Sequence, residues 1–232
     1  APAAVESAVR GDDPHLPRTR LVLVENSYGG KHGYPLSPDY FAQIAAVARR
    51  HNLAIHMDGA RLFNAAVALG VSAATIAQHA NTVTVCLSKG LSAPVGAVLA
   101  GSNDQIQRGR AIRKMLGGSQ RQAGIMASAG LVGLCNMVDR LQKDHATAAR
   151  LAQGLNSLGC GLTAAAPDTN IVMVSVAGSG IDSAGWVLRL QRAGTLVRAW
   201  APGVLRCVTH RHIDDDAVDA AVRAFERVAL EA

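Results

Sequence analysis

Short apolar runs alternate with amphipathic stretches along the first half of the chain. The amphipathic stretches have helical spacing at about 38–50 and 62–69; Ser37-Pro38 opens the first and Gly70 closes the second. The apolar runs have the length and the valine, leucine and isoleucine content of strands, and they cover 20–24, 53–58, 82–87 and 95–99. This alternation predicts an α/β fold with a largely parallel sheet covered by helices on both faces.

From about residue 103 the pattern changes to longer helices and shorter, mixed strands. Helical spacing covers 103–116 and then a long run at 122–158, with glycines between the two. The remaining strands and helices are expected at 170–176, after 182, at 195–199, at 204–209 and from 214. The pattern predicts a large domain at 1–135 and a small C-terminal α+β domain at 136–232.

Two polar residues stand at the ends of neighbouring apolar runs. Asp58 ends one run in His56-Met57-Asp58-Gly59-Ala60-Arg61, and Lys89 follows the next in Leu87-Ser88-Lys89-Gly90-Leu91. Because ligands gather at the carboxyl ends of parallel strands, we expect the two to face one pocket. An amine that forms a Schiff base and a carboxylate that holds a ring nitrogen protonated are what pyridoxal phosphate (PLP) requires. Taken alone, each residue is more often an ordinary strand end or turn.

Composition limits the class of protein. The chain has 232 residues, of which 49% are hydrophobic and 3% aromatic, and its net charge of +6 is dispersed, which does not favour nucleic-acid binding. A few of the cations are suited to a small anionic ligand. The four cysteines form no CxxC pair, so we expect free thiols and no metal site. With neither a membrane-length apolar stretch nor a signal pattern, the expected location is the cytoplasm.

Five stretches carry a more specific signal because they occur together and in order; they are residues 15–34, 56–65, 86–96, 113–124 and 206–210. The series closely resembles the low-specificity L-threonine aldolases, over nearly the whole chain. Those are PLP enzymes of the aspartate aminotransferase fold (fold type I) in the β-eliminating lyase superfamily. The resemblance implies a PLP cofactor, an amino-acid substrate and a homo-oligomer built as a dimer of dimers.

Four residues take cofactor or substrate roles from this resemblance. Lys89 resembles the Schiff-base lysine, and Asp58 resembles the carboxylate that pairs with the pyridinium nitrogen, which helps the ring to withdraw electrons. Arg61 resembles the arginine near the phenolic oxygen and the substrate carboxylate. Arg206 resembles the arginine that grips that carboxylate, a task suited to its planar fork.

Four further residues have weaker assignments. His15 corresponds to a family histidine near the substrate hydroxyl, where a neutral imidazole accepts a proton, although a lone loop histidine is more often a surface residue. Lys114 and Arg121 resemble residues that approach a neighbouring subunit's cofactor phosphate. Ser88 is a candidate phosphate donor or a partner for the backbone. His210 and His212 look like a metal pair only superficially, and we interpret them as structural.

The chain departs from the family pattern in three places. Ser92 stands where the family often has glycine, and a triple glycine appears here as Gly117-Gly118-Ser119; we expect both changes to keep the backbone path. Family members also begin with a long segment that carries the main phosphate-binding turn and a ring that stacks on the cofactor. The chain opens at Ala1-Pro2-Ala3 without it, which suggests a fragment or a missing half supplied by another chain.

The resemblance therefore implies an aldehyde-lyase. It would cleave L-threonine, L-allo-threonine or related β-hydroxy-α-amino acids by a retro-aldol reaction to glycine and an aldehyde. Two alternatives remain open: another fold-type-I PLP lyase or aminotransferase, and a catalytically incomplete fragment that serves only as an assembly surface.

Overall fold

The computed structural model describes residues 2–11 and 13–231, which form two compact units. The first unit runs to Ser27 and from Pro35 to Val138; the second comprises Tyr28–Tyr34 and the residues from Asp139 onward. The large and small domains expected at 1–135 and 136–232 stay a prediction for the whole protein. Among the described residues, no helix combines the length and the apolarity needed to cross a membrane.

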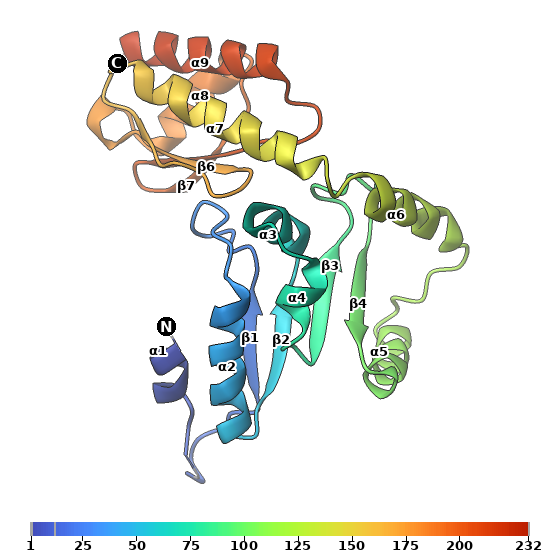
Figure 1. The fold of residues 1–232 in the computed structure, drawn as a ribbon. Coiled ribbons are helices and arrows are strands. Elements are labelled where there is room, and N and C mark those ends of the chain that lie inside the picture. The colour runs from blue at the N-terminus through green and yellow to red at the C-terminus, as the bar shows by residue number, and fades with distance from the viewer. Residues whose placement is uncertain (1, 12, 232) are drawn as a thin grey trace. The chain divides into compact units, whose positions relative to one another are not determined.

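The first unit is built on a four-stranded sheet with the order β1-β2-β3-β4 (Figure 1). The strands are β1 Leu21–Glu25, β2 Ala54–Asp58, β3 Thr82–Cys86 and β4 Ala97–Gly101. The first three are parallel, and β4 runs antiparallel to β3. The predicted largely parallel sheet is thus confirmed, and the carboxyl ends of β1, β2 and β3 share one edge.

Three helices pack on one face of this sheet; they are α2 Pro38–Arg50, α3 Leu62–Leu69 and α4 Ala73–Ala77. The Ser37 hydroxyl accepts the Tyr40 N–H at the start of α2, and Gly70 ends α3 in the left-handed conformation, as the sequence predicts. Phe41 and Ile44 of α2 are fully buried with strand residues such as Met57. This packing fixes the strand ends that carry the site.

The sequence predicts helices over both faces of the sheet, but among the described residues only one face of β1 is covered. Val22 on the helix side is 8% exposed, whereas Leu21 and Leu23 on the other face are 52% and 65% exposed. A strand alternates its side chains between two faces, so these leucines form an apolar surface that the described residues leave uncovered.

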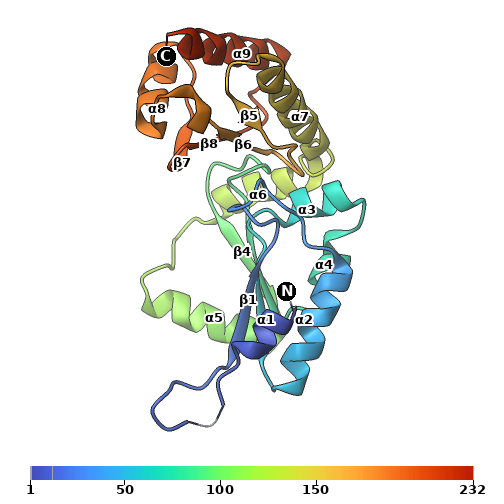
Figure 2. The same cartoon turned by 90° about the vertical axis from the view of Figure 1, so that its left-hand side faces the viewer.

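Three helices complete the first unit: α1 Pro2–Ser7, α5 Asn103–Met115 and α6 Gly124–Asn136. The Ser102 side chain accepts the Gln105 N–H while the Gln105 side chain accepts the Ser102 N–H, and this capping box starts α5. In Figure 2, α5 lies beside the end of the sheet where β4 finishes, and the loop that leads into β1 extends beyond the same end. That end is the amino edge of the parallel strands, opposite the edge that carries Asp58.

The second unit is an antiparallel sheet with helices, which confirms the predicted α+β class. Its strands, in the order β5-β6-β8-β7, are β5 Thr163–Ala164, β6 Ile171–Ser175, β8 Val204–Val208 and β7 Arg198–Ala201. Its helices are α7 Leu141–Ser157, the 3-10 turn η1 Ala177–Ser179, α8 Ser183–Arg192 and α9 Asp215–Leu230. The stacked rings of Trp186 and Phe225, 5.6 Å between centroids, lie in its core.

The single long helix expected over 122–158 is wrong, because the chain forms α6 and α7 with a turn at 137–140 between them. Met137 and Val138 pack against Leu87 and Leu91 of the first unit. In contrast, α7 buries Leu151 and Leu155 in the core of the second unit. The two segments therefore pack in different hydrophobic cores, and helical spacing alone cannot show where the chain passes from one core to the other.

Candidate active site at the carboxyl edge of the parallel sheet

Asp58 and Lys89 lie at the same edge of the first unit's sheet. Asp58 is the last residue of β2, and Lys89 follows the end of the adjacent parallel strand β3 by three residues. Asp58 is partly buried, whereas Lys89 is exposed. The sequence therefore located both at neighbouring strand ends correctly, and the lysine amine is accessible to a ligand at this edge.

The turn after β2 holds the Asp58 carboxylate in a fixed orientation. Its Oδ1 accepts the N–H of Ala60 at 3.0 Å, and the N–H of Gly59 donates to Thr84 O at 2.7 Å. A Cβ at position 59 would lie 2.8 Å from Thr84 O, so only glycine allows the turn to approach β3 this closely. The approach of this turn to β3 thus requires glycine at position 59, and the Ala60 N–H orients the Asp58 carboxylate.

Arg61 belongs to the same turn and is the residue before helix α3. Burial lowers the pKa of its guanidinium below the ordinary value, and the nearby Glu25, Cys86 and Asp58 act in the opposite direction, Glu25 most strongly. The sequence prediction named Arg61 and Asp58 but missed Glu25 and Cys86. Both are the last residues of their strands, the same signal that pointed to Asp58.

A second polar group, behind Asp58, was also missed as a site component. His56 lies two residues before Asp58 on β2, on the same face of the sheet. Its Nδ1 is 2.7 Å from Thr82 Oγ1, and its Nε2 is 3.3 Å from Thr84 Oγ1. Both ring nitrogens therefore bind hydroxyls of β3, and the imidazole ties together the two strands whose ends carry Asp58 and Lys89.

The loop that carries Lys89 is closed by its own backbone. Ser92 N donates to Lys89 O, Ala93 N to Leu87 O and Leu87 N to Gly96 O, each at 2.9 Å. Leu87 and Leu91 anchor the loop in a small apolar cluster. Ser92 has φ 60°, a left-handed conformation that glycine adopts without strain, which explains why the backbone path suits the family's glycine.

Ser88 is exposed beside Lys89, and its Oγ lies 3.4 Å from Cys86 Sγ. Its hydroxyl can rotate, so the contact with the thiol is compatible with either of the roles expected for Ser88.

The structure does not bring two other predicted residues to this edge. His15 is exposed in the loop that enters β1 at the amino edge, where its backbone N–H donates to Asp13 Oδ1 at 2.8 Å. Lys114 is exposed in the last turn of α5, and in Figure 2 α5 and the loop before β1 lie toward the opposite edge. Arg121 is exposed in the loop that leads from α5 to α6.

Arg206 lies on β8 in the second unit. Its guanidinium carbon is 4.8 Å from the centroid of the Trp200 ring, a distance typical of a cation–π contact. The Trp200 ring therefore packs against a partly buried guanidinium. His210 and His212 follow β8 with their rings 5.8 Å apart, and no group of three metal-binding side chains forms within residues 2–11 and 13–231.

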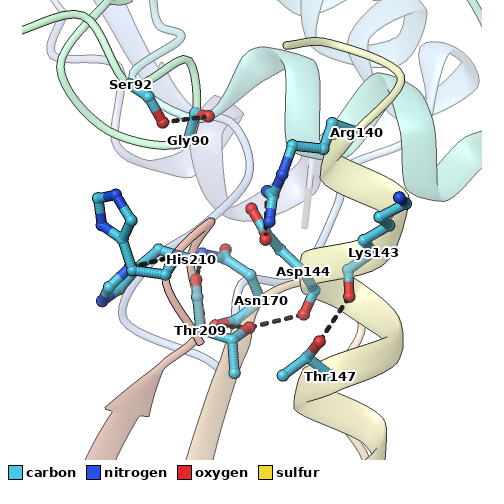
Figure 3. A network of polar contacts seen from close by, with 10 residues as sticks. Gly90, Ser92, Arg140, Lys143, Asp144, Thr147, Asn170, Thr209 and His210 are labelled. Atoms are coloured by element: carbon cyan, nitrogen blue, oxygen red, sulfur yellow. Dashed lines mark hydrogen bonds and ion pairs between the residues drawn. The ribbon is translucent and has the colours of Figure 1, made fainter. Parts of the chain in front are cut away.

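Polar contacts join Asn170, just before β6, and Thr209, just after β8, to the start of α7 (Figure 3). The Thr209 hydroxyl donates to Asp144 O at 2.6 Å, and the Asn170 amide donates to Thr209 O at 2.8 Å. Arg140 forms an ion pair with the buried Asp144 carboxylate at 2.6 Å. No local pattern in the sequence marks this cluster, because its members are far apart along the chain.

The fold is that of the PLP-dependent fold-type-I enzymes. Leishmania major threonine aldolase superposes with a TM-score of 0.78 at 19% identity, over 98% of this chain and 67% of that protein. A Thermus thermophilus aspartate aminotransferase double mutant gives a TM-score of 0.72 at 17% identity, over 98% and 60% of the two chains. At these identities the likeness establishes the fold.

Sequence similarity narrows the class. The beta-eliminating lyase family model matches residues 1–179, and the chain belongs to that family. Low-specificity L-threonine aldolase 1 of Arabidopsis thaliana is 38% identical over 98% of this chain and 64% of its own length. The low specificity L-threonine aldolase of Escherichia coli K12 is 39% identical over 97% and 65%. The chain thus spans slightly less than two thirds of these relatives.

Proposed function

We propose that this chain is the catalytic part of a PLP-dependent aldehyde-lyase that converts β-hydroxy-α-amino acids into glycine and an aldehyde. The observation that carries the proposal is the group at the carboxyl edge of β1–β3, where Lys89, Asp58 and Arg61 occupy neighbouring strand ends and one turn. The relatives named as low-specificity L-threonine aldolases support L-threonine as a substrate.

The donor set fits PLP. The accessible Lys89 amine suits the cofactor's carbonyl, and the oriented, partly buried Asp58 carboxylate suits a protonated ring nitrogen. The Arg61 guanidinium suits the phenolic oxygen, and the Ser88 hydroxyl suits the phosphate. When bound, PLP supplies an electron sink for the pair of electrons left when the Cα–Cβ bond breaks.

The protein's own groups then bind the substrate and move its protons. Arg61 and Arg206 carry guanidiniums suited to the substrate carboxylate, and each can form two parallel hydrogen bonds with it. The Lys89 amine would hold the cofactor through its carbonyl, and the same amine could carry a proton to Cα of the substrate. His15 would accept the proton of the β-hydroxyl, and because its loop lies at the amino edge, that role requires a loop from a second subunit.

An oligomer with shared sites is the second part of the proposal. Met115, Leu116 and Ile125 are 82%, 81% and 77% exposed, and they lie within a few residues of Lys114 or Arg121 along the chain. An apolar surface of this kind suits burial against another subunit. We propose that Lys114 and Arg121 reach the cofactor phosphate of that subunit; a homotetramer and a cytoplasmic location stay predictions.

Replacing Lys89 tests the proposal. The natural full-length protein should gain the visible absorption band of lysine-bound PLP and release glycine and acetaldehyde in equal amounts from L-threonine. Lys89→Ala should lose the band and reduce turnover by about a thousandfold or more, since both covalent and proton-transfer roles disappear. Lys143→Ala, an exposed lysine of α7, is the control. An unchanged band in Lys89→Ala, or an amino-group transfer without aldehyde, would overturn the proposal.

A further inference from the structure

The two tryptophans of the chain have contrasting environments. Trp186 is fully buried in a core, and its indole N–H donates to Ser179 Oγ at 2.8 Å. Trp200, on the last strand in the sheet order, is 41% exposed, and its ring centroid lies 4.8 Å from the guanidinium carbon of Arg206. Core packing explains Trp186 but not Trp200, so the contact with the arginine is the feature that needs a role.

The backbone of β7 is irregular at Trp200. Ala199 pairs with Leu205 and Ala201 pairs with Val204, and these two partners are consecutive residues of β8. Trp200 is therefore the extra residue of a β-bulge. Bulges redirect side chains and are frequent next to active sites. The bulge and the ring contact with Arg206 thus occur at one point of the sheet.

The register positions beside Arg206 supply no opposite charge. Its partner on β6 is Met173, and its partner on β7 is Arg198, a second cation directly opposite. Like charges at such positions disfavour each other. The face of an aromatic ring carries partial negative charge and attracts a guanidinium. The Trp200 ring therefore stabilises Arg206 at a position where the charge of Arg198 has the opposite effect.

An indole stabilises a guanidinium without accepting its hydrogen bonds in a lone pair. The ring offers a π face and one N–H donor, whereas a carboxylate of the protein would bind the same N–H groups that a ligand's carboxylate needs. A guanidinium that is already held in place also loses less conformational freedom when it binds a planar carboxylate. A tryptophan is therefore a suitable neighbour for an arginine that binds a carboxylate ligand.

We propose that Trp200 is a positioning residue, which holds the Arg206 guanidinium for the carboxylate of the amino-acid substrate. The inference rests on the proposed function, in which Arg206 binds that carboxylate. Trp200 acts through Arg206 and has no contact of its own with the reacting atoms in this assignment. Because the carboxylate is bound alike before and during bond cleavage, the ring contact strengthens substrate binding and leaves the rate of cleavage unchanged.

The first test is the kinetics of L-threonine cleavage by the natural full-length protein. Trp200→Leu keeps an apolar side chain but removes the ring; it should raise KM about fivefold and leave kcat and PLP affinity within about twofold. Trp200→Phe keeps an aromatic face and should stay within about twofold of the wild-type KM. Leu188→Ala, at an exposed apolar residue of α8, is the control and should change neither constant. A fall in kcat at unchanged KM, or equal rises in KM for the leucine and phenylalanine variants, would overturn the positioning role.

The second test asks whether the ring acts through Arg206. Affinity for glycine, the product, is titrated by the change in cofactor absorbance, which needs no turnover. In an Arg206→Gln background, Trp200→Leu should change this affinity less than about twofold, because the guanidinium is absent. An effect as large as in the wild type would overturn the role assigned to Trp200.

The cofactor-free protein gives an independent result. Trp200→Leu should lower the melting temperature of the wild type more than that of Arg206→Gln, because the two side chains are in contact. Equal losses in both backgrounds would overturn the contact itself. If the wild-type protein binds no PLP, the proposed function fails together with this use of Arg206, while the melting comparison still decides whether Trp200 stabilises the guanidinium.

Discussion

His56 Nδ1 lies 2.7 Å from Thr82 Oγ1, so a side chain of β2 is bonded directly to its neighbour on β3. The same ring contacts Thr84 through Nε2 at 3.3 Å. His56 lies two residues before Asp58 on the same face of β2. Its contacts add side-chain bonds to a strand pairing of only three register positions. The imidazole is therefore a support for the edge that carries the site.

We expect His56→Phe to destabilise the protein by about 1–2 kcal/mol, because it keeps a ring of similar shape but leaves partly buried hydroxyls without their partner. Thr82→Val should cost a similar amount, and the double variant less than the sum, as measured by urea unfolding. Thr82→Ser keeps the hydroxyl and is the control. Strictly additive losses would show that the two side chains are not coupled.

Ser92→Gly should stabilise the protein by about 1 kcal/mol. Ser92 has φ 60°, and a non-glycine residue pays a conformational cost there that glycine avoids. The hydroxyl contributes only a 3.3 Å contact with Gly90 O, drawn in Figure 3, so little is lost with it. The midpoint of urea unfolding should rise with an unchanged slope. Ser92→Ala, which keeps the strain and removes the hydroxyl, should not stabilise, and a gain in that variant would contradict the explanation.

The positions of residues that a local pattern marks were predicted well from the sequence. Asp58 and Lys89 each follow an apolar run, and parallel neighbours place such residues at one edge whatever the exact register. The Ser37-Pro38 helix start and the Gly70 helix end are likewise local signals. In all these cases the information lies within a few residues of the chain.

Features that depend on register or on a change of core were not predicted. Glu25 ends an apolar run as Asp58 does, but its place beside Asp58 depends on the pairing of β1 with β2, which the sequence of neither strand specifies. The break between α6 and α7 has the same origin, since Met137 and Leu151 both suit a helix but pack in different cores. Helical spacing shows that one face of a helix is buried, but it does not show which core that face packs against.

Burial raises the pKa of the Cys207 thiol to about 12, because the thiolate would be formed in an apolar core. The unfolded chain loses this proton near 9, so between pH 9 and 12 the folded state binds more protons and its stability falls as pH rises. The loss should approach about 1.4 kcal/mol per pH unit within that window and be absent below it.

The measurement is the pH dependence of the unfolding free energy in wild type and Cys207→Ala. The variant loses stability at every pH because of the cavity, but the extra downward slope above pH 9 should disappear. Cys135→Ala, at an exposed thiol, should keep the wild-type slope. In the native protein at pH 8, Cys135 should react with iodoacetamide well before Cys207, as peptide mass spectrometry would show. Equal slopes in wild type and Cys207→Ala would contradict the prediction.

Shared active sites make a prediction about mixed oligomers. If each site combines Lys89 of one subunit with Lys114 of another, Lys89→Ala and Lys114→Ala are each nearly inactive alone. In a mixed dimer one site then carries both substitutions and the other carries neither. With random pairing, half of the dimers are mixed, so about a quarter of all sites are intact and about a quarter of wild-type activity returns on co-refolding.

The control is a mixture of Lys89→Ala with Asp58→Asn, two residues of the same unit and the same sheet edge. Every site in that mixture carries one of the substitutions, so no activity should return. Native mass spectrometry must show mixed species in both samples, since only then does activity report on the sites. Recovery in the first mixture and none in the second would place Lys114 across a subunit interface from Lys89, and the absence of recovery in both would show that each subunit supplies both lysines to its own site.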